Sequence, residues 1–171
     1  MIIRELKPTD FDDFVSTFFS YFDEVKDDPS FGLALMREKP TMDEERVWFN
    51  TVLKDMQEGN VVNIVAEVDS HVIGNCVVRR VKPKSPEDHR GNLGIAVKKG
   101  FRGQGIGEAL MRAAIDRSRG KFEIIELAVV NTNQGAKQLY EKLGFTTYGT
   151  RKYALKRGGG YYDEDLMYLK L

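Results

Sequence analysis

The periodicity of apolar residues changes several times along this chain, which predicts alternating strands and helices. Met1–Leu6 alternates weakly and predicts a first strand. Thr9 and Asp12 then form a capping-box pattern at the start of a helix. The apolar residues of this helix recur at helical spacing and form one face, which we interpret as core: Phe11, Phe14, Val15, Phe18, Phe19 and Phe22. The run Asp27-Asp28-Pro29-Ser30 predicts its end.

A second helix and a strand pair are predicted next. Thr41 and Glu44 have capping-box spacing, and Gly59-Asn60 predicts the end of the helix that they begin. Its apolar residues again share one side: Trp48, Phe49, Val52, Leu53 and Met56. The segments Val61–Val68 and His71–Val81 predict two strands joined by a tight turn. A polar, proline-containing loop follows.

The middle of the chain has the most informative pattern. The apolar run Leu93–Val97 predicts a strand, the segment Arg102–Gly107 a glycine-rich turn, and Glu108–Arg119 an amphipathic helix ending at Gly120. Such a turn leaves several backbone N–H groups unpaired beside the positive end of a helix dipole, so it predicts a phosphate site. The turn lacks the Gly-Lys-Ser/Thr of a P-loop and the G-x-G-x-x-G spacing of a dinucleotide site, so both nucleotide interpretations are weak.

The last third predicts a strand, a helix and a strand pair. Phe122–Val130 is rich in branched residues and predicts a strand. A short helix over about Gln134–Leu143 is closed by Gly144. Two final strands, at Thr146–Leu155 and Tyr161–Leu171, flank three glycines.

Composition limits the classes of protein that fit. The 171 residues predict a single domain, 1–171, with a sizeable core. Lys and Arg together equal Asp and Glu, at 26 each, which argues against nucleic acid or a membrane surface as the main partner. The single cysteine, Cys76, excludes an internal disulfide and predicts a buried thiol. The absence of a signal peptide or a long apolar run predicts a cytoplasmic protein.

Two motifs resemble those of one family. Arg102–Gly107 resembles the Arg/Gln-x-x-Gly-x-Gly/Ala signature of the GCN5-related N-acetyltransferase (GNAT) superfamily. The segment Asn133–Phe145 is very similar to its Asn-x-x-Ala-x-x-Leu-Tyr-x-x-x-Gly-Phe motif, at the expected distance. The resemblance covers nearly the whole chain. It implies an α/β (α+β) GNAT fold, with a mixed, mostly antiparallel sheet of about seven strands, helices on both faces, and a splay between the fourth and fifth strands.

The resemblance also implies an activity. The chain is expected to be an acetyl-CoA-dependent N-acetyltransferase that works by direct attack of a primary amine in a ternary complex, without a metal. The acceptor is left open among a polyamine, a small amine, an amino acid and a peptide N-terminus. An acyl-CoA-binding sensor module of the same fold, without turnover, is the alternative. The oligomeric state is not set by the sequence, and a homodimer is left open.

The resemblance assigns roles to matching residues. The backbone of Ile95, Ala96 and Val97 would pair with the pantetheine arm, and Gly94 predicts a bulge in that strand. The pyrophosphate would be held by Arg102, Gly103, Gln104, Gly105, Ile106, Gly107 and Glu108. Lys98 and Lys99 precede this turn, and a solvated loop is the simpler interpretation for them. Asn133 would either contact pantetheine or cap the following helix. Tyr140 would be the general acid that protonates the departing thiolate.

The general base is open, because two positions that carry a glutamate in some family members hold Ala128 and Asn92 here. Glu126, His89 and a water chain ending on backbone carbonyls are the alternatives. Without a strong base, α-amines are easier acceptors than lysine-type amines. An acidic rim beside the acceptor site is formed in this prediction by Asp10, Asp12, Asp13, Asp23, Glu24, Asp27 and Asp28, and Asp163, Glu164 and Asp165 are within possible reach of it.

Overall fold

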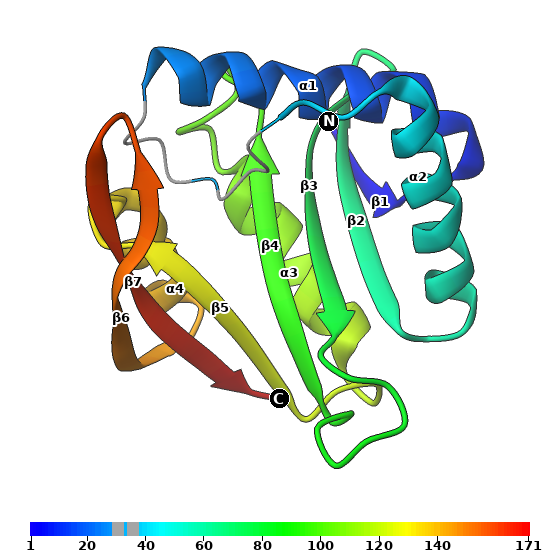
Figure 1. The fold of residues 1–171 in the computed structure, drawn as a ribbon. Coiled ribbons are helices and arrows are strands. Elements are labelled where there is room, and N and C mark those ends of the chain that lie inside the picture. Colours follow the sequence, from blue (N-terminus) through cyan, green and yellow to red (C-terminus); the bar gives the residue numbers. More distant parts are fainter. Residues whose placement is uncertain (29–32, 34–37) are drawn as a thin grey trace.

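The fold is known from a computed structural model, which describes residues 1–28, 33 and 38–171. Pro29 and Ser30, predicted to end the first helix, lie outside the described residues. One seven-stranded sheet runs through the described chain in the order β1-β2-β3-β4-β5-β7-β6 (Figure 1). Its strands are β1 (Ile2–Glu5), β2 (Val61–Val68), β3 (His71–Arg80), β4 (Arg90–Val97), β5 (Ile124–Val130), β6 (Thr146–Arg157) and β7 (Gly160–Lys170).

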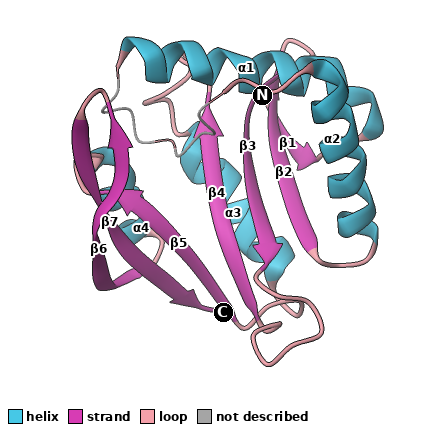
Figure 2. Cartoon of the chain, viewed as in Figure 1, coloured by secondary structure: helices cyan, strands magenta, loops and turns pink. Residues whose placement is uncertain are grey.

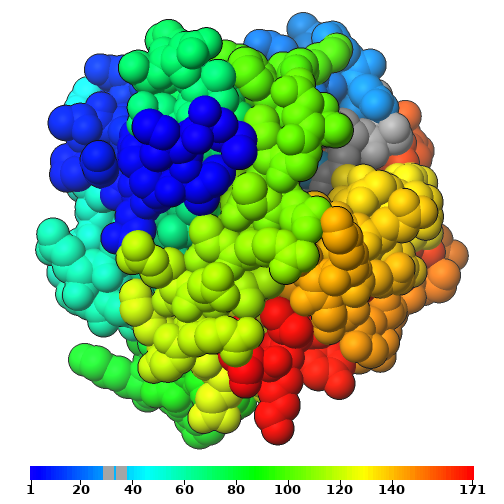
Figure 3. Space-filling model, turned by 180° about the vertical axis from the view of Figure 1, so that it is seen from behind, coloured from blue at the N-terminus to red at the C-terminus, as the bar shows by residue number. Residues whose placement is uncertain are grey.

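Helices cover both faces of the sheet, as predicted. They are α1 (Phe11–Asp27), α2 (Met42–Gln57), α3 (Ile106–Ser118) and α4 (Gln134–Lys142), with a 3₁₀ turn, η1 (Pro8–Asp10), before α1. The helices α1 and α2 lie on one face, and α3 and α4 on the other (Figures 1 and 2). Figure 3, seen from behind, shows the face that α3 and α4 cover.

Alternation along the strands builds a separate core on each face. In β2, Val61 and Val65 pack with α1 and α2, whereas Val62 and Ile64 pack with α3. Successive side chains of a strand point to opposite faces, so a strand with apolar residues at both sets of positions is buried on both sides. The predicted stripe of α1 contributes Phe11, Phe14 and Val15 to the first of these cores. The sheet therefore forms the rigid middle layer of the molecule.

The two N-terminal helices begin differently. At α2 the predicted capping box is present: Glu44 N–H donates to Thr41 Oγ1 at 3.3 Å, and Thr41 N–H donates to Glu44 Oε2 at 2.8 Å. The capping box predicted at Thr9 and Asp12 is wrong, because α1 follows the turn η1 and has no side-chain cap. Asp10 instead accepts the Lys7 N–H at 2.7 Å, and the ion pair that Arg4 forms with Asp10 anchors this turn to β1.

The sheet splits in its centre. Among the strands of the described residues, β4 and β5 alone are parallel neighbours, and they pair over Arg90–Asn92 and Ile124–Glu126. Beyond these residues β4 continues beside β3 and β5 beside β7, so the two halves diverge (Figure 1). The bulge predicted at Gly94 is wrong, since Gly94 lies opposite Val77 in an unbroken β3–β4 register. The predicted splay is present, and it comes from the early end of the β4–β5 pairing.

Candidate functional site

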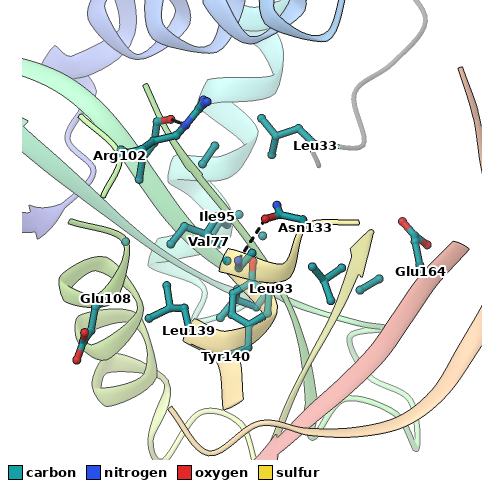
Figure 4. Close-up of a pocket in the computed structure, with 18 of the residues that line it drawn as sticks. Leu33, Val77, Leu93, Ile95, Arg102, Glu108, Asn133, Leu139, Tyr140 and Glu164 are labelled. Carbon is teal, nitrogen blue, oxygen red and sulfur yellow. Dashed lines mark hydrogen bonds between the residues drawn. The ribbon is translucent and has the colours of Figure 1, made fainter. Parts of the chain in front are cut away.

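A cavity of about 1200 Å³ lies in the gap between the diverging strands. One wall comes from β3, β4 and the start of α3, and the other from β5, α4 and β7 (Figure 4). Both predicted motifs therefore meet at one place. The carboxyl ends of parallel strands are where ligands bind in open α/β sheets, because the connections to the following helices leave space there.

The glycine turn forms one end of this cavity. Gly103 and Gly105 line it with φ angles of +73° and +79°, a left-handed conformation that favours glycine. A Cβ atom at either position would meet no atom within 4 Å, so both face open space. The N–H groups of Ile106, Gly107 and Glu108 have no backbone acceptor in the described part of the chain. Together these groups form a pocket of partial positive charge suited to phosphate.

The edge of β4 forms a second ligand surface. Past Asn92 the backbone on the β5 side has no strand partner among the described residues. Ile95, Ala96 and Val97 line the cavity along this edge. An extended ligand with amide groups can bind such an edge as an added strand. The gap therefore has the shape and the free hydrogen-bonding groups that a pantetheine arm requires.

Arg102 lies at the mouth of the cavity and bridges two elements. Its Nε donates to the Val97 carbonyl at 2.7 Å, and its two Nη atoms donate to the Glu24 carboxylate of α1 at 2.7 and 3.0 Å. The Arg102 guanidinium thus connects the glycine turn to α1, and the residue also lines the cavity. Lys98 and Lys99 do not line the cavity.

Asn133 begins α4 and also lines the cavity. The Ala136 N–H donates to its Oδ1 at 3.2 Å, so the capping interpretation is confirmed. Its Nδ2 makes no hydrogen bond with another described residue, so that group remains available to a ligand. The contact with pantetheine stays a prediction.

Tyr140 lies on α4 in the wall of the cavity and is 8% exposed. Burial raises the pKa of its phenol, and the nearby Cys76 raises it further. The hydroxyl makes no hydrogen bond within the described ranges, so it is a protonated donor without a partner. Cys76 is itself fully buried, as predicted, and burial raises the pKa of its thiol.

The candidates for the base lie outside the cavity. Glu126 is held by Arg90, whose Nη2 and Nε donate to its two oxygens at 2.5 and 3.2 Å. His89 is exposed in the loop before β4, with its Nδ1 atom 3.1 Å from the Pro86 carbonyl oxygen. Neither residue lines the cavity, whereas Ala128 and Asn92 do. Asn92 and Glu126 pair at the last joined position of β4 and β5, and the Glu126 side chain is held by Arg90 instead of lining the cavity.

The predicted acidic rim is mostly wrong. Of its seven residues only Asp28 lines the cavity. Three others are engaged elsewhere: Asp10 by Arg4, Asp13 by His71 and the Val72 N–H, and Glu24 by Arg102. Two acidic residues of α1 thus attach this helix to the rest of the fold, Asp13 to β3 and Glu24 to the glycine turn.

Three consecutive acidic residues near the start of β7 point to different faces of the sheet. Glu164 lines the cavity, while its neighbours Asp163 and Asp165 do not. Asp163 accepts from Lys152 Nζ at 2.8 Å, and Asp165 accepts from Lys137 Nζ at 2.7 Å. Strand alternation predicts that the middle residue faces opposite its neighbours, but only the fold shows which side holds the cavity.

Comparison with known proteins agrees with this geometry. A sequence model of the acetyltransferase (GNAT) family matches residues 18–145. L-amino acid N-acetyltransferase AaaT of Escherichia coli (strain K12) is 34% identical over 101 residues, 57% of this chain and 62% of that protein. A putative [ribosomal protein bS18]-alanine N-acetyltransferase of Bacillus subtilis (strain 168) is 34% identical over 90 residues, 52% of this chain and 56% of that protein. Both matches thus span about three-fifths of the relatives' length.

A solved structure shows the same fold over its full length. The ribosomal-protein-alanine N-acetyltransferase from Brucella melitensis superposes with a TM-score of 0.85 at 22% identity, covering 100% of both chains.

No helix in the described ranges is long and apolar enough to cross a membrane. The seven-stranded sheet parted between β4 and β5, the glycine turn at its opening and the family match over residues 18–145 lead to one conclusion: the chain belongs to the acetyltransferase (GNAT) family.

Proposed function

We propose that this protein is an acetyl-CoA-dependent N-acetyltransferase whose acceptor is an α-amine. The observation that carries the proposal is the convergence of three features on one cavity: the unpaired N–H groups after Gly105, the free edge of β4, and the hydroxyl of the largely buried Tyr140. In this arrangement the pyrophosphate binds the turn, the pantetheine arm follows Ile95–Val97, and the thioester reaches Tyr140.

The reaction is a direct transfer in a ternary complex. The neutral amine attacks the thioester carbonyl carbon, the C–N bond forms, and the C–S bond breaks. Tyr140 donates its proton to the leaving thiolate. An ordinary phenol of pKa ~10 is a weaker acid than a thiol of pKa ~8.5, a mismatch of about 2 kcal/mol. Burial raises the pKa of Tyr140, but the same apolar surroundings raise the pKa of a thiol, as they do at Cys76, so the mismatch need not grow.

The class of acceptor is inferred from the free energy needed to deprotonate its amine. An α-amine of pKa about 8 is partly neutral at pH 7, whereas a lysine-type amine near 10.4 costs about 4 kcal/mol to deprotonate. Ala128 and Asn92 line the cavity without supplying a carboxylate. The buried carboxylate that also lines it, Glu164, is already paired with Arg151. The names of two relatives, an L-amino acid N-acetyltransferase and a putative [ribosomal protein bS18]-alanine N-acetyltransferase, point to acceptors of the same class. A free amino acid or a peptide N-terminus is therefore favoured over a polyamine.

Glu126 has no proton-transfer step in this proposal. Both of its carboxylate oxygens are occupied by Arg90, and the pair lies where β4 and β5 are still joined. Removing Glu126 from this bidentate pair would leave the partly buried Arg90 guanidinium with the longer 3.4 Å contact to Glu87 alone among the described side chains, which is costly.

A thiol-release assay tests the proposed function. The protein is incubated with acetyl-CoA and a panel of amino acids, N-terminal peptides, small amines and polyamines, and free coenzyme A is measured. Acceptor-dependent release, strongest for α-amines, supports the proposal. The alternative, a sensor module that binds acyl-CoA without turnover, predicts binding of acetyl-CoA in calorimetry and no release with any acceptor.

A further inference from the structure

We propose that Glu164 binds the ammonium group of the acceptor and accepts its first proton. The proposal deepens the proposed function and rests on it, because it assigns the acceptor's place in the same cavity. It concerns a residue on β7, on the far side of the gap from the glycine turn (Figure 4).

The sheet directs Glu164 toward the gap. It lies opposite Val130 at the end of β5, next to the pair that Ala128 forms with Leu166. Side chains two residues apart on a strand share a face, so Glu164 and Ala128 lie on the same side of the sheet. Both line the cavity. The wall therefore carries a carboxylate from β7 beside the apolar surface of Ala128.

Glu164 is nearly buried and only half satisfied. Its side chain is 9% exposed, and its Oε2 accepts from Arg151 Nη1 at 3.0 Å. No donor in the described ranges reaches Oε1. Oε1 is not among the fully buried atoms of the described residues, so it is reachable from the cavity and free to accept a hydrogen bond from a ligand.

The other two carboxylates that line the described cavity, Glu108 and Asp28, differ from Glu164 in their partners. Both oxygens of Glu108 are occupied, by Arg112 at 2.8 Å and by Lys142 at 2.6 Å. Asp28 follows the end of α1 and already has an interaction partner. Among the carboxylates that line the described cavity, Glu164 thus combines deep burial with a free oxygen.

Charged residues around Glu164 come from β6 and from the end of α1. Arg151 on β6 pairs with it directly. Arg157, at the end of β6, donates to the Leu33 carbonyl; burial lowers the pKa of its guanidinium, and the negative charge of Glu164 opposes that shift. Asp28 adds a negative charge on the cavity wall. The other charged residues that line the cavity lie on β3 and around the glycine turn: Arg79, Arg80, Arg102 and Glu108.

Every proton in the proposed acetyl transfer is accounted for. The acceptor ammonium passes one proton to Glu164 Oε1, which releases it to solvent after turnover. The neutral amine then attacks, the C–N bond forms and the C–S bond breaks. The second proton leaves the nitrogen to water, while Tyr140 protonates the thiolate and regains a proton from water. The net reaction releases one proton for each ammonium acetylated.

Glu164→Gln tests this assignment, with Asp163→Asn as the matched control from the opposite face of the same strand. We expect kcat/KM for an α-amine acceptor at neutral pH to fall by roughly 10²-fold or more in Glu164→Gln, with recovery as pH rises and the acceptor becomes neutral. The affinity for acetyl-CoA should not change. Asp163→Asn should retain the wild-type rate and pH profile.

A binding measurement separates this inference from the proposed function. Calorimetry with n-butylamine as probe, on protein saturated with coenzyme A, should show weaker binding to Glu164→Gln than to wild type and Asp163→Asn, whether or not the protein turns over. Equal amine binding by all three proteins overturns the inference, as does an equal loss of activity in the two variants. If Glu164→Gln does not fold, Glu164→Asp keeps the charge but withdraws the oxygen; unchanged amine binding in that variant also overturns it.

Discussion

The glycine turn allows a prediction in which stability and ligand binding change independently. Gly107 is the second residue of α3, and a Cβ there would lie 3.5 Å from Leu139 Cδ2 and 3.9 Å from Ile95 Cδ1, which is ordinary contact. Gly107→Ala should therefore stabilise the helix by up to about 1 kcal/mol. Gly105 has a φ of +79° and open space around its Cβ, so Gly105→Ala should destabilise by about 1–2 kcal/mol through backbone strain alone.

The methyl group of Gly105→Ala lies in the open space where the phosphates would approach the backbone, and that of Gly107→Ala narrows the cavity beside Leu139 and Ile95. Loss of one hydrogen bond to a charged group costs about 1.5–3 kcal/mol, so acetyl-CoA affinity should fall about 10- to 150-fold in each variant. Thermal unfolding should place Gly107→Ala above wild type by about 2–4 °C and Gly105→Ala below it. Calorimetric titration measures the affinity. Wild-type affinity in both variants, with the expected opposite shifts in melting temperature, would mean that the turn holds no phosphate.

Three further predictions concern single side chains. Tyr140→Phe removes only the proton donor, so kcat should fall roughly 10²-fold or more while acetyl-CoA affinity stays unchanged; wild-type turnover would make Tyr140 a packing residue. Glu126→Gln should leave the pH profile of kcat/KM unchanged, and a loss at neutral pH that recovers at high pH would establish Glu126 as the base. The pKa of Asp165 is lowered by its hydrogen bonds from Lys137 and Thr150, so its stabilisation is present above its unfolded pKa and is lost as pH falls through its folded pKa. Asp165→Asn should accordingly lower the melting temperature at pH 7 but have little effect at about pH 2.

Local signals explain what the sequence predicts well. The capping boxes, the glycine turn and the N-cap of α4 depend on residues within a few positions of each other. The box at Thr41 and Glu44 is therefore found as predicted, and Asn133 caps α4. The pattern at Thr9 and Asp12 fails because Asp10 is drawn to Arg4 on the neighbouring strand β1, and no local rule contains that partner.

Distant partners explain what the sequence misses. Glu126 is on the expected strand, but the arginine that occupies it is 36 residues earlier. Glu24, expected at an acidic rim, meets Arg102 from 78 residues away. Charge counts predict a surface for such residues and cannot predict which cation neutralises each one. Strand alternation along β7 predicts that Glu164 points to the face opposite Asp163 and Asp165. Which of the two faces borders the cavity depends on where β4 and β5 separate.

The central claim is acetyl transfer to an α-amine, and one measurement tests it directly. A peptide with a free N-terminus and one internal lysine is incubated with the protein and acetyl-CoA, and tandem mass spectrometry locates the acetyl group. The account predicts acetylation of the N-terminal α-amine at neutral pH, an unmodified lysine, and a strong decrease with Tyr140→Phe. Acetylation of the lysine, or no product with protein that binds acetyl-CoA, would contradict it.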